Sequence, residues 1–252
     1  MQSPAAISKA LQQRADADHE RKRRKQIQPL RGLRGVQARD IVAVLVEAWK
    51  KPPRLPADAA NLHRLFSTAF EDGLVAMGLL AAVLPDDPLE ALDLADRWLE
   101  MVDDTETADT LGWLLLGPGL LAAQEPFVDT INQLRSEGRP AARRAAVMAT
   151  MAALPVPIEG PAAAALRERT GQRRIAFVEK PLTPYLEAAL PPFIRDTDAQ
   201  VRKATARAMR SWGTFQPDVV EELIEKTKGG VPRYFREEVA KGIRKGRRLN
   251  KS

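Results

Sequence analysis

The 252-residue sequence contains no cysteine and only two histidines, His19 and His63. Disulfide bonds and thiolate metal sites are therefore excluded, and two histidines are too few for a histidine-based site, so we predict neither a metal nor another cofactor. A reducing cytoplasm is compatible with this composition. Aromatic residues make up only 5% of the chain whereas Ala, Leu, Arg and Val abound, which favours packed helices over sheets.

The sequence also lacks a long apolar run. The longest runs, 74–84 and 111–123, fall short of the ~20 apolar residues that a membrane span needs, and the second contains Pro118. The N-terminal residues carry charges with no apolar segment ahead of them, so we do not expect a secretory signal. These features predict a soluble, cytoplasmic protein without a membrane partner.

The charges are unevenly distributed along the chain, whose net charge is +6. Lys and Arg outnumber Asp and Glu by 13 to 5 in residues 1–54 and by 24 to 13 in residues 131–252, whereas residues 55–130 contain 2 cations and 15 acids. Basic blocks at both ends are typical of a protein that binds a polyanion. A soluble basic protein with solvated Arg and Lys side chains is the alternative.

Helical periodicity and proline breaks predict an all-α fold. We expect the helix at 89–100 to merge with a following helix that carries Asp109 and ends at Pro118 and Gly119. No run shows sustained two-residue alternation, so we predict no strand. The other predicted helices span 5–14, 39–49, 57–69, 71–84, 125–135, 140–154, 162–168, 190–210, 217–226 and 234–245.

The predicted helical domain covers residues 29–246. A basic arm, 1–28, precedes it and is expected to be partly frayed; its run Arg21–Lys25 is either solvated or neutralised by phosphates. A proline-rich insertion at 155–192 interrupts the domain, and 247–252 form a frayed tail.

Three helical segments repeat one pattern, in which a small or apolar residue precedes an arginine, a polar residue and further small residues. Asp196 or Asp198 stands a few residues before Val201 and Arg202, which matches the aspartate-then-Val-Arg signature of HEAT repeats. We therefore predict a HEAT-like helical-repeat solenoid with a concave basic face on which partners bind. The three segments are 141–149, 200–208 and 234–242.

Four short motifs follow one another along most of the chain. They are Gly35-Val36-Gln37; Asp109 seven residues before Leu116-Gly117; Arg144 within ARRAAVM; and a C-terminal series of Val201, Lys203-Ala204, Met209-Arg210, Trp212 and Pro217-Asp218-Val219-Val220. In this order they resemble the DNA alkylation repair family, the HEAT-like repeat DNA glycosylases of the AlkD and AlkC type. Each motif is short, and their collinear order carries the resemblance.

The resemblance implies binding of double-stranded DNA and hydrolysis of the N-glycosylic bond of an N3- or N7-alkylated purine. The alkylated base departs as a neutral group while the sugar becomes an oxocarbenium ion, which a fixed carboxylate stabilises. Asp109 would be that carboxylate. Arg144 would bind a flanking phosphate or hold Asp109, although HEAT helices also use such an arginine to bond a neighbouring repeat.

The resemblance is incomplete at the site itself. The family's cleft carries two tryptophans, and their positions are occupied here by Thr105 and Arg207. An aromatic ring attracts a cationic base, whereas Arg207 would repel it and attract phosphate. We expect Trp98 and Trp212 in the core, which leaves Trp113, one helical turn after Asp109, to compensate. The predicted DNA-binding cations are Arg143, Arg144, Arg202, Lys203, Arg207 and Arg210.

Three functions stay open at this point. The first is a DNA glycosylase of altered lesion preference with Asp109 as its catalytic residue. The second is a non-catalytic DNA-binding scaffold that has lost the aromatic clamp, in which Asp109 is a solvated helix residue. The third, a protein–protein adaptor solenoid, does not explain the collinear motifs at Asp109 and Arg144. Because an aspartate in a phosphate-binding groove repels its ligand, its presence favours the enzyme, and we expect a monomer.

Overall fold

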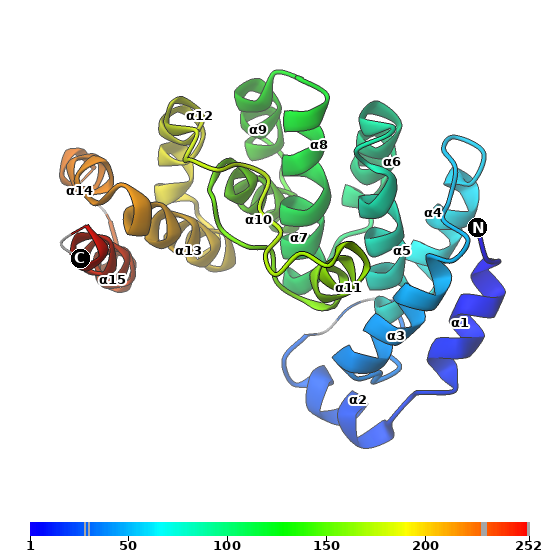
Figure 1. The fold of residues 1–252 in the computed structure, drawn as a ribbon. Helices are drawn as coiled ribbons and strands as arrows, with labels where there is room; N and C mark the ends of the chain where they lie inside the picture. The colour runs from blue at the N-terminus through cyan, green and yellow to red at the C-terminus, as the bar shows by residue number, and fades with distance from the viewer. Residues whose placement is uncertain (28, 30, 228–230, 251–252) are drawn as a thin grey trace.

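The computed structural model describes residues 1–27, 29, 31–227 and 231–250. Within these residues the regular structure is helical, and an isolated bridge between Gly32 and Ala69 is the one β-type contact. The prediction of an all-α helical-repeat fold is therefore confirmed. Figure 1 shows the helices stacked side by side into an elongated array. No helix in the described part is long and apolar enough to cross a membrane.

The N-terminal helices are part of the stack. The Ser3 hydroxyl caps the first helix by accepting a hydrogen bond from the backbone N–H of Ala6, and Ile7 and Leu11 on the same helix are buried in the core. Residues 4–12 of the predicted arm are therefore a packed helix rather than frayed, and residues 17–24 form a second helix that buries none of its residues. These helices are α1 (Pro4–Gln12), α2 (Ala17–Arg24) and α3 (Ala38–Ala48).

The remaining stack consists of helix pairs. The first helices of the pairs are α4 (Ala59–Thr68), α6 (Pro88–Leu99), α9 (Phe127–Arg135), α12 (Thr183–Ala189) and α14 (Pro217–Lys226). The second helices are α5 (Phe70–Val83), α7 (Thr105–Leu111), α10 (Pro140–Ala149), α13 (Ala199–Phe215) and α15 (Arg233–Leu249). Each second helix packs against the next one along the chain, so together they form a continuous row, called here the inner row.

The helix that carries Asp109 differs from its prediction at both ends. It does not merge with α6, because the Asp104 carboxylate caps α7 by accepting hydrogen bonds from the N–H groups of Glu106 and Thr107. It also does not end at Pro118. A π-helical turn, η1 (Gly112–Leu116), leads into α8 (Gly117–Ala122), and Pro118 lies in the first turn of α8, where its missing N–H has little cost.

Two glycines set the distance between this helix and α10. A Cβ atom at Gly112 would overlap the carbonyl oxygen of Ala145, and one at Gly117 would overlap that of Ala149. The five-residue spacing of the two glycines fits the π-helical turn, which places both on the side that faces α10. Glycine at these positions therefore permits the close approach on which the site described below depends.

The proline-rich insertion reaches back to the start of the molecule. Its helix α11 (Pro161–Thr170) packs against α3 and α5, with Ala162, Ala163 and Ala165 buried. The chain then returns to the stack in α12, which packs against α9 and the 3₁₀ turn η2 (Thr150–Ala153) after α10. The insertion therefore covers residues 155–182 rather than the predicted 155–192. The C-terminal tail is also shorter than predicted, since α15 continues to Leu249.

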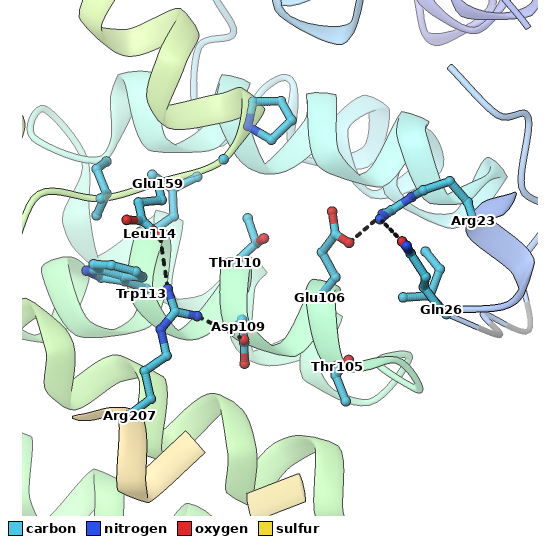
Figure 2. Close-up of a pocket in the computed structure, with 14 residues that line it drawn as sticks. Arg23, Gln26, Thr105, Glu106, Asp109, Thr110, Trp113, Leu114, Glu159 and Arg207 are labelled. Carbon is cyan, nitrogen blue, oxygen red and sulfur yellow. Dashed lines mark hydrogen bonds and ion pairs between the residues drawn. The ribbon is translucent and has the colours of Figure 1, made fainter. Parts of the chain in front are cut away.

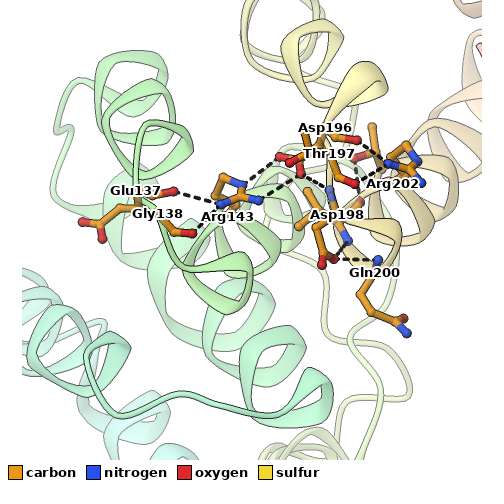
Figure 3. Close-up of polar contacts among 10 residues, drawn as sticks. Glu137, Gly138, Arg143, Asp196, Thr197, Asp198, Gln200 and Arg202 are labelled. Atoms are coloured by element: carbon orange, nitrogen blue, oxygen red, sulfur yellow. Dashed lines mark hydrogen bonds and ion pairs between the residues drawn. The ribbon is translucent and has the colours of Figure 1, made fainter. Parts of the chain in front are cut away.

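The repeated arginine pattern corresponds to a repeated structural contact. Arg143 in α10 and Arg202 in α13 each donate from Nη1 to the carbonyl oxygens of the residues five and six positions earlier (Figure 3). Arg143 also forms a bidentate pair with Asp196, at 2.8 and 3.1 Å. These two arginines therefore fasten the start of an inner-row helix to its preceding loop, and Arg143 joins two repeats.

Two tryptophans are core residues, as predicted. Trp98 is fully buried and stacks on Phe66, with ring centroids 4.4 Å apart and planes 2° from parallel. Trp212 is also fully buried, and its indole N–H donates to the Gln216 side chain at 2.7 Å.

Candidate active site and nucleic-acid interface

A cavity of about 410 Å³ opens where α2, α7, α13 and the insertion meet. Figure 2 shows charged side chains from all four segments around it. The structure thus brings together four of the residues that the sequence singles out, Thr105, Asp109, Trp113 and Arg207. The remaining lining residues are Arg23, Gln26, Ile27, Glu106, Thr110, Leu114, Ile158, Glu159, Gly160 and Pro161.

Asp109 is held at the edge of this cavity by arginine. Arg144 donates from Nε to Oδ1 at 2.6 Å and from Nη2 to Oδ2 at 2.8 Å, so the contact is bidentate. The Arg207 Nη1 atom lies 3.6 Å from Oδ2. The Asp109 side chain is 19% exposed and the Arg144 side chain 12%, so the carboxylate is fixed but still reaches the cavity.

The helix register explains why these groups meet. Asp109, Arg144 and Lys203 are the fifth residues of α7, α10 and α13, which are consecutive helices of the inner row. Equivalent positions on neighbouring helices of a stack lie next to one another. Arg144 extends the row by donating from Nη1 to the carbonyl oxygen of Gln200 at 2.7 Å, and Lys203 beyond it is exposed. The glycine contact at Gly112 brings α7 close enough for the bidentate pair.

Arg207 lies one helical turn after Lys203 and contacts three of the groups around the cavity. Its guanidinium carbon is 5.2 Å from the centre of the Trp113 ring, and its Nη2 donates to Glu159 Oε2 at 3.2 Å, besides the contact to Asp109. Trp113 is 6% exposed, and the Arg207 side chain is 42% exposed. At this cavity the chain therefore places an arginine over the ring of a tryptophan.

The acidic side chains of the cavity each have an arginine partner. Glu106 pairs with Arg23 of α2, and Glu159 of the insertion pairs with Arg207. The guanidinium of Arg23 also lies 5.7 Å from the centre of the Phe70 ring. Charges of both signs therefore compensate one another around the cavity. Arg23, which belongs to the basic run 21–25, is paired there with the Glu106 carboxylate.

A second cavity of about 310 Å³ adjoins the first and shares Trp113, Glu159 and Arg207 with it. It extends along α13 to α15, whose Gly242 allows so close an approach that a Cβ atom there would overlap the carbonyl oxygen of Arg210. Two cations and two hydroxyl side chains complete its polar lining: Arg210, Lys245, Ser211 and Thr214. Sequence reasoning missed Lys245 and Glu159, which belong to none of the four motifs.

Apart from Arg144, which pairs with Asp109, the predicted DNA-binding cations separate into two groups. Lys203, Arg207 and Arg210 are accessible, although Arg210 pairs with Glu238. Arg143, 11% exposed, and Arg202 are instead occupied by the loop contacts described above and line neither cavity. The structure therefore shows a structural role for Arg143 and Arg202, and DNA binding by these two residues stays a prediction.

The fold and the cavities define a helical-repeat protein with a charged site on its inner row. The described residues contain no group of three or more His, Cys, Asp or Glu side chains that could hold a metal ion. The model of the DNA alkylation repair enzyme family matches residues 7–243, and the chain belongs to this family. Neither the curated proteins nor the solved structures yield a match. Membership confirms the resemblance and assigns the chain a role in DNA repair.

Proposed function

We propose that this protein binds double-stranded DNA as a monomer and hydrolyses the N-glycosylic bond of N3- or N7-alkylated purines. The observation that supports this proposal is the Asp109 carboxylate, which Arg144 fixes with two hydrogen bonds at the edge of a cavity. A charge that is already oriented stabilises developing opposite charge without reorganisation during the reaction.

The chemistry requires little more than this carboxylate. An N3- or N7-alkylated purine is cationic. When the C1′–N bond breaks, both bonding electrons stay with the purine, which departs as a neutral base, so no strong general acid is needed. Positive charge then develops on the sugar, where Asp109 stabilises it and orients a water molecule. The water oxygen bonds to C1′ and loses one proton, which passes to the solvent. Arg144 acts as a positioning residue, because it holds both oxygens of Asp109.

The proposed DNA interface follows α13 and α15 beside the cavities. Lys203, Arg207, Arg210 and Lys245 would neutralise backbone phosphates there. Each neutralised phosphate contributes about −0.9 to the slope of log affinity against log salt, so four contacts predict a slope of about −3 to −4. Fluorescence anisotropy of a labelled duplex measures this slope, and affinity that stays flat from low to physiological salt would contradict DNA binding.

One observation favours a second candidate function, the non-catalytic DNA-binding scaffold. Asp109 is paired with Arg144 and approached by Arg207, so its charge already has protein partners, as expected of a residue that ties α7 to α10. The absence of tryptophan at Thr105 and Arg207 points the same way.

Base release separates the two functions. Duplexes that carry N7- or N3-alkylpurines are incubated with the protein, and free base is measured by chromatography and mass spectrometry. The enzyme releases the alkylated base and leaves an abasic site. Binding with the salt dependence given above, but without release from any alkylated duplex, would leave only the scaffold.

A further inference from the structure

Arg207 makes the contacts that a bound planar cation would make. Its guanidinium lies 5.2 Å from the centre of the Trp113 ring, within the distance at which an aromatic face attracts a cation. Two carboxylates flank it, with Asp109 Oδ2 at 3.6 Å from Nη1 and Glu159 Oε2 at 3.2 Å from Nη2. A ring and two acids thus surround one positive charge (Figure 2).

We propose that the space over Trp113 is a binding position for a planar aromatic cation, which the guanidinium of Arg207 fills until the ligand displaces it. The identity of the natural ligand, an alkylated purine in DNA, rests on the function proposed above. A guanidinium is itself planar and delocalised, so an aromatic cation replaces it in the same stacked arrangement. Arg207 is then a specificity-determining residue that competes with the ligand.

The exposure of its contacts makes Arg207 displaceable. The side chains of Arg207 and Glu159 are 42% and 72% exposed, and ion pairs accessible to solvent contribute little to stability. Arg207 also lines the second cavity, which gives the displaced guanidinium a place to go. A backbone phosphate near Arg210 and Lys245 would attract it there, so DNA binding and emptying of the cation position favour each other.

The insertion contributes directly to this position. Glu159 precedes α11, whose packing against α3 and α5 fixes where this part of the insertion enters the cavity. When Arg207 leaves, Glu159 and Asp109 both face the ligand, and their charges favour a cation over a neutral base of the same shape. We therefore assign Glu159 a part in selecting the charge of the ligand.

Binding of free nucleosides tests the proposal without DNA or catalysis. The probes are 7-methylguanosine, at a pH where its base is cationic, and neutral guanosine, and the readout is quenching of tryptophan fluorescence. Arg207→Gln should tighten binding of the cation by roughly two- to thirty-fold, the range of a cation–π contact, and leave guanosine unchanged. Arg97→Gln is the matched control, because Arg97 is an exposed, paired arginine on α6 outside both cavities.

A second variant tests the acidic side of the position. Glu159→Gln, introduced into the Arg207→Gln protein, should weaken binding of the cationic nucleoside and leave guanosine unaffected. Thermal unfolding checks that each variant is folded, which the exposure of both side chains favours. Trp113→Phe should remove most of the quenching, because Trp98 and Trp212 are fully buried and Trp49 lines neither cavity.

The outcomes separate this inference from the proposed function. Equal affinity of wild type and Arg207→Gln for the cation, an equal gain for guanosine, or an equal gain in Arg97→Gln would overturn the inference even if the protein releases bases. Conversely, tighter and charge-selective binding by Arg207→Gln would support the inference even if no alkylated duplex yields free base.

Discussion

Replacement of Arg144 by glutamine tests whether this residue holds Asp109 or binds a phosphate. The change removes both hydrogen bonds to Asp109 and the contact to the carbonyl oxygen of Gln200. Removing one partner of a fully buried ion pair costs ~3–5 kcal/mol. Because the Asp109 side chain is 19% exposed and Arg207 stays nearby, we expect a smaller loss of about 2 kcal/mol in the free energy of unfolding. For a chain of this length, that lowers Tm by roughly 4–8 °C.

The functional consequence follows from the same contacts. A carboxylate that is no longer fixed stabilises the sugar cation poorly, so single-turnover base release should fall by ~10²-fold, as a displacement of about 1 Å produces. Duplex affinity should keep its salt dependence, whereas Lys203→Gln, the equivalent position on α13, should reduce the slope by about 1. Denaturant unfolding, release kinetics and anisotropy measure the three effects. If Arg144→Gln instead reduces the salt slope by about 1 and leaves stability unchanged, Arg144 is a phosphate ligand and our account of the pair is wrong.

Two further predictions concern stability. Gly112→Ala should lower the free energy of unfolding by ~1–3 kcal/mol or more, because the new Cβ overlaps the backbone of Ala145, whereas Gly138→Ala meets no atom within 4 Å and should have little effect in the same denaturant titration. Partial desolvation on the surface of α6, and after it the charges of Glu100 and Glu137, raise the pKa of Asp96, although its side chain is exposed, so the ionised form is disfavoured in the folded state. Asp96→Asn should therefore raise Tm at neutral pH, and this gain should vanish as the pH falls below the ordinary pKa of an aspartate; a gain that persists in acid would contradict the argument.

The fold could be predicted from local signals because helical periodicity and proline positions are short-range. The predicted helix at 217–226 coincides with α14. The helix of Asp109 was predicted less well, because a proline such as Pro118 usually ends a helix. No local sequence pattern indicates that a π-helical turn precedes Pro118 and places this proline in the first turn of α8. Packing of α11 against α3 joins segments more than a hundred residues apart, and no local pattern encodes that contact.

The site was predicted only in part for a similar reason. Spacings of four residues put Asp109 and Trp113 on one face, and both line the cavity. The adjacent arginines Arg143 and Arg144 cannot be told apart by residue type. Their side chains point in directions about 100° apart on the helix, so one meets Asp196 across a repeat boundary and the other meets Asp109. Only the packing of the helices determines which of the two arginines pairs with Asp109.

Replacement of Asp109 by asparagine tests the central claim most directly, in a single-turnover assay of base release from a duplex that carries an N7- or N3-alkylpurine. Asparagine has nearly the same shape but no charge, so we expect release to be abolished while duplex affinity stays the same or increases through the lost repulsion of phosphate. Release at the wild-type rate by Asp109→Asn, with duplex binding unchanged, would show that this carboxylate does not stabilise the sugar cation.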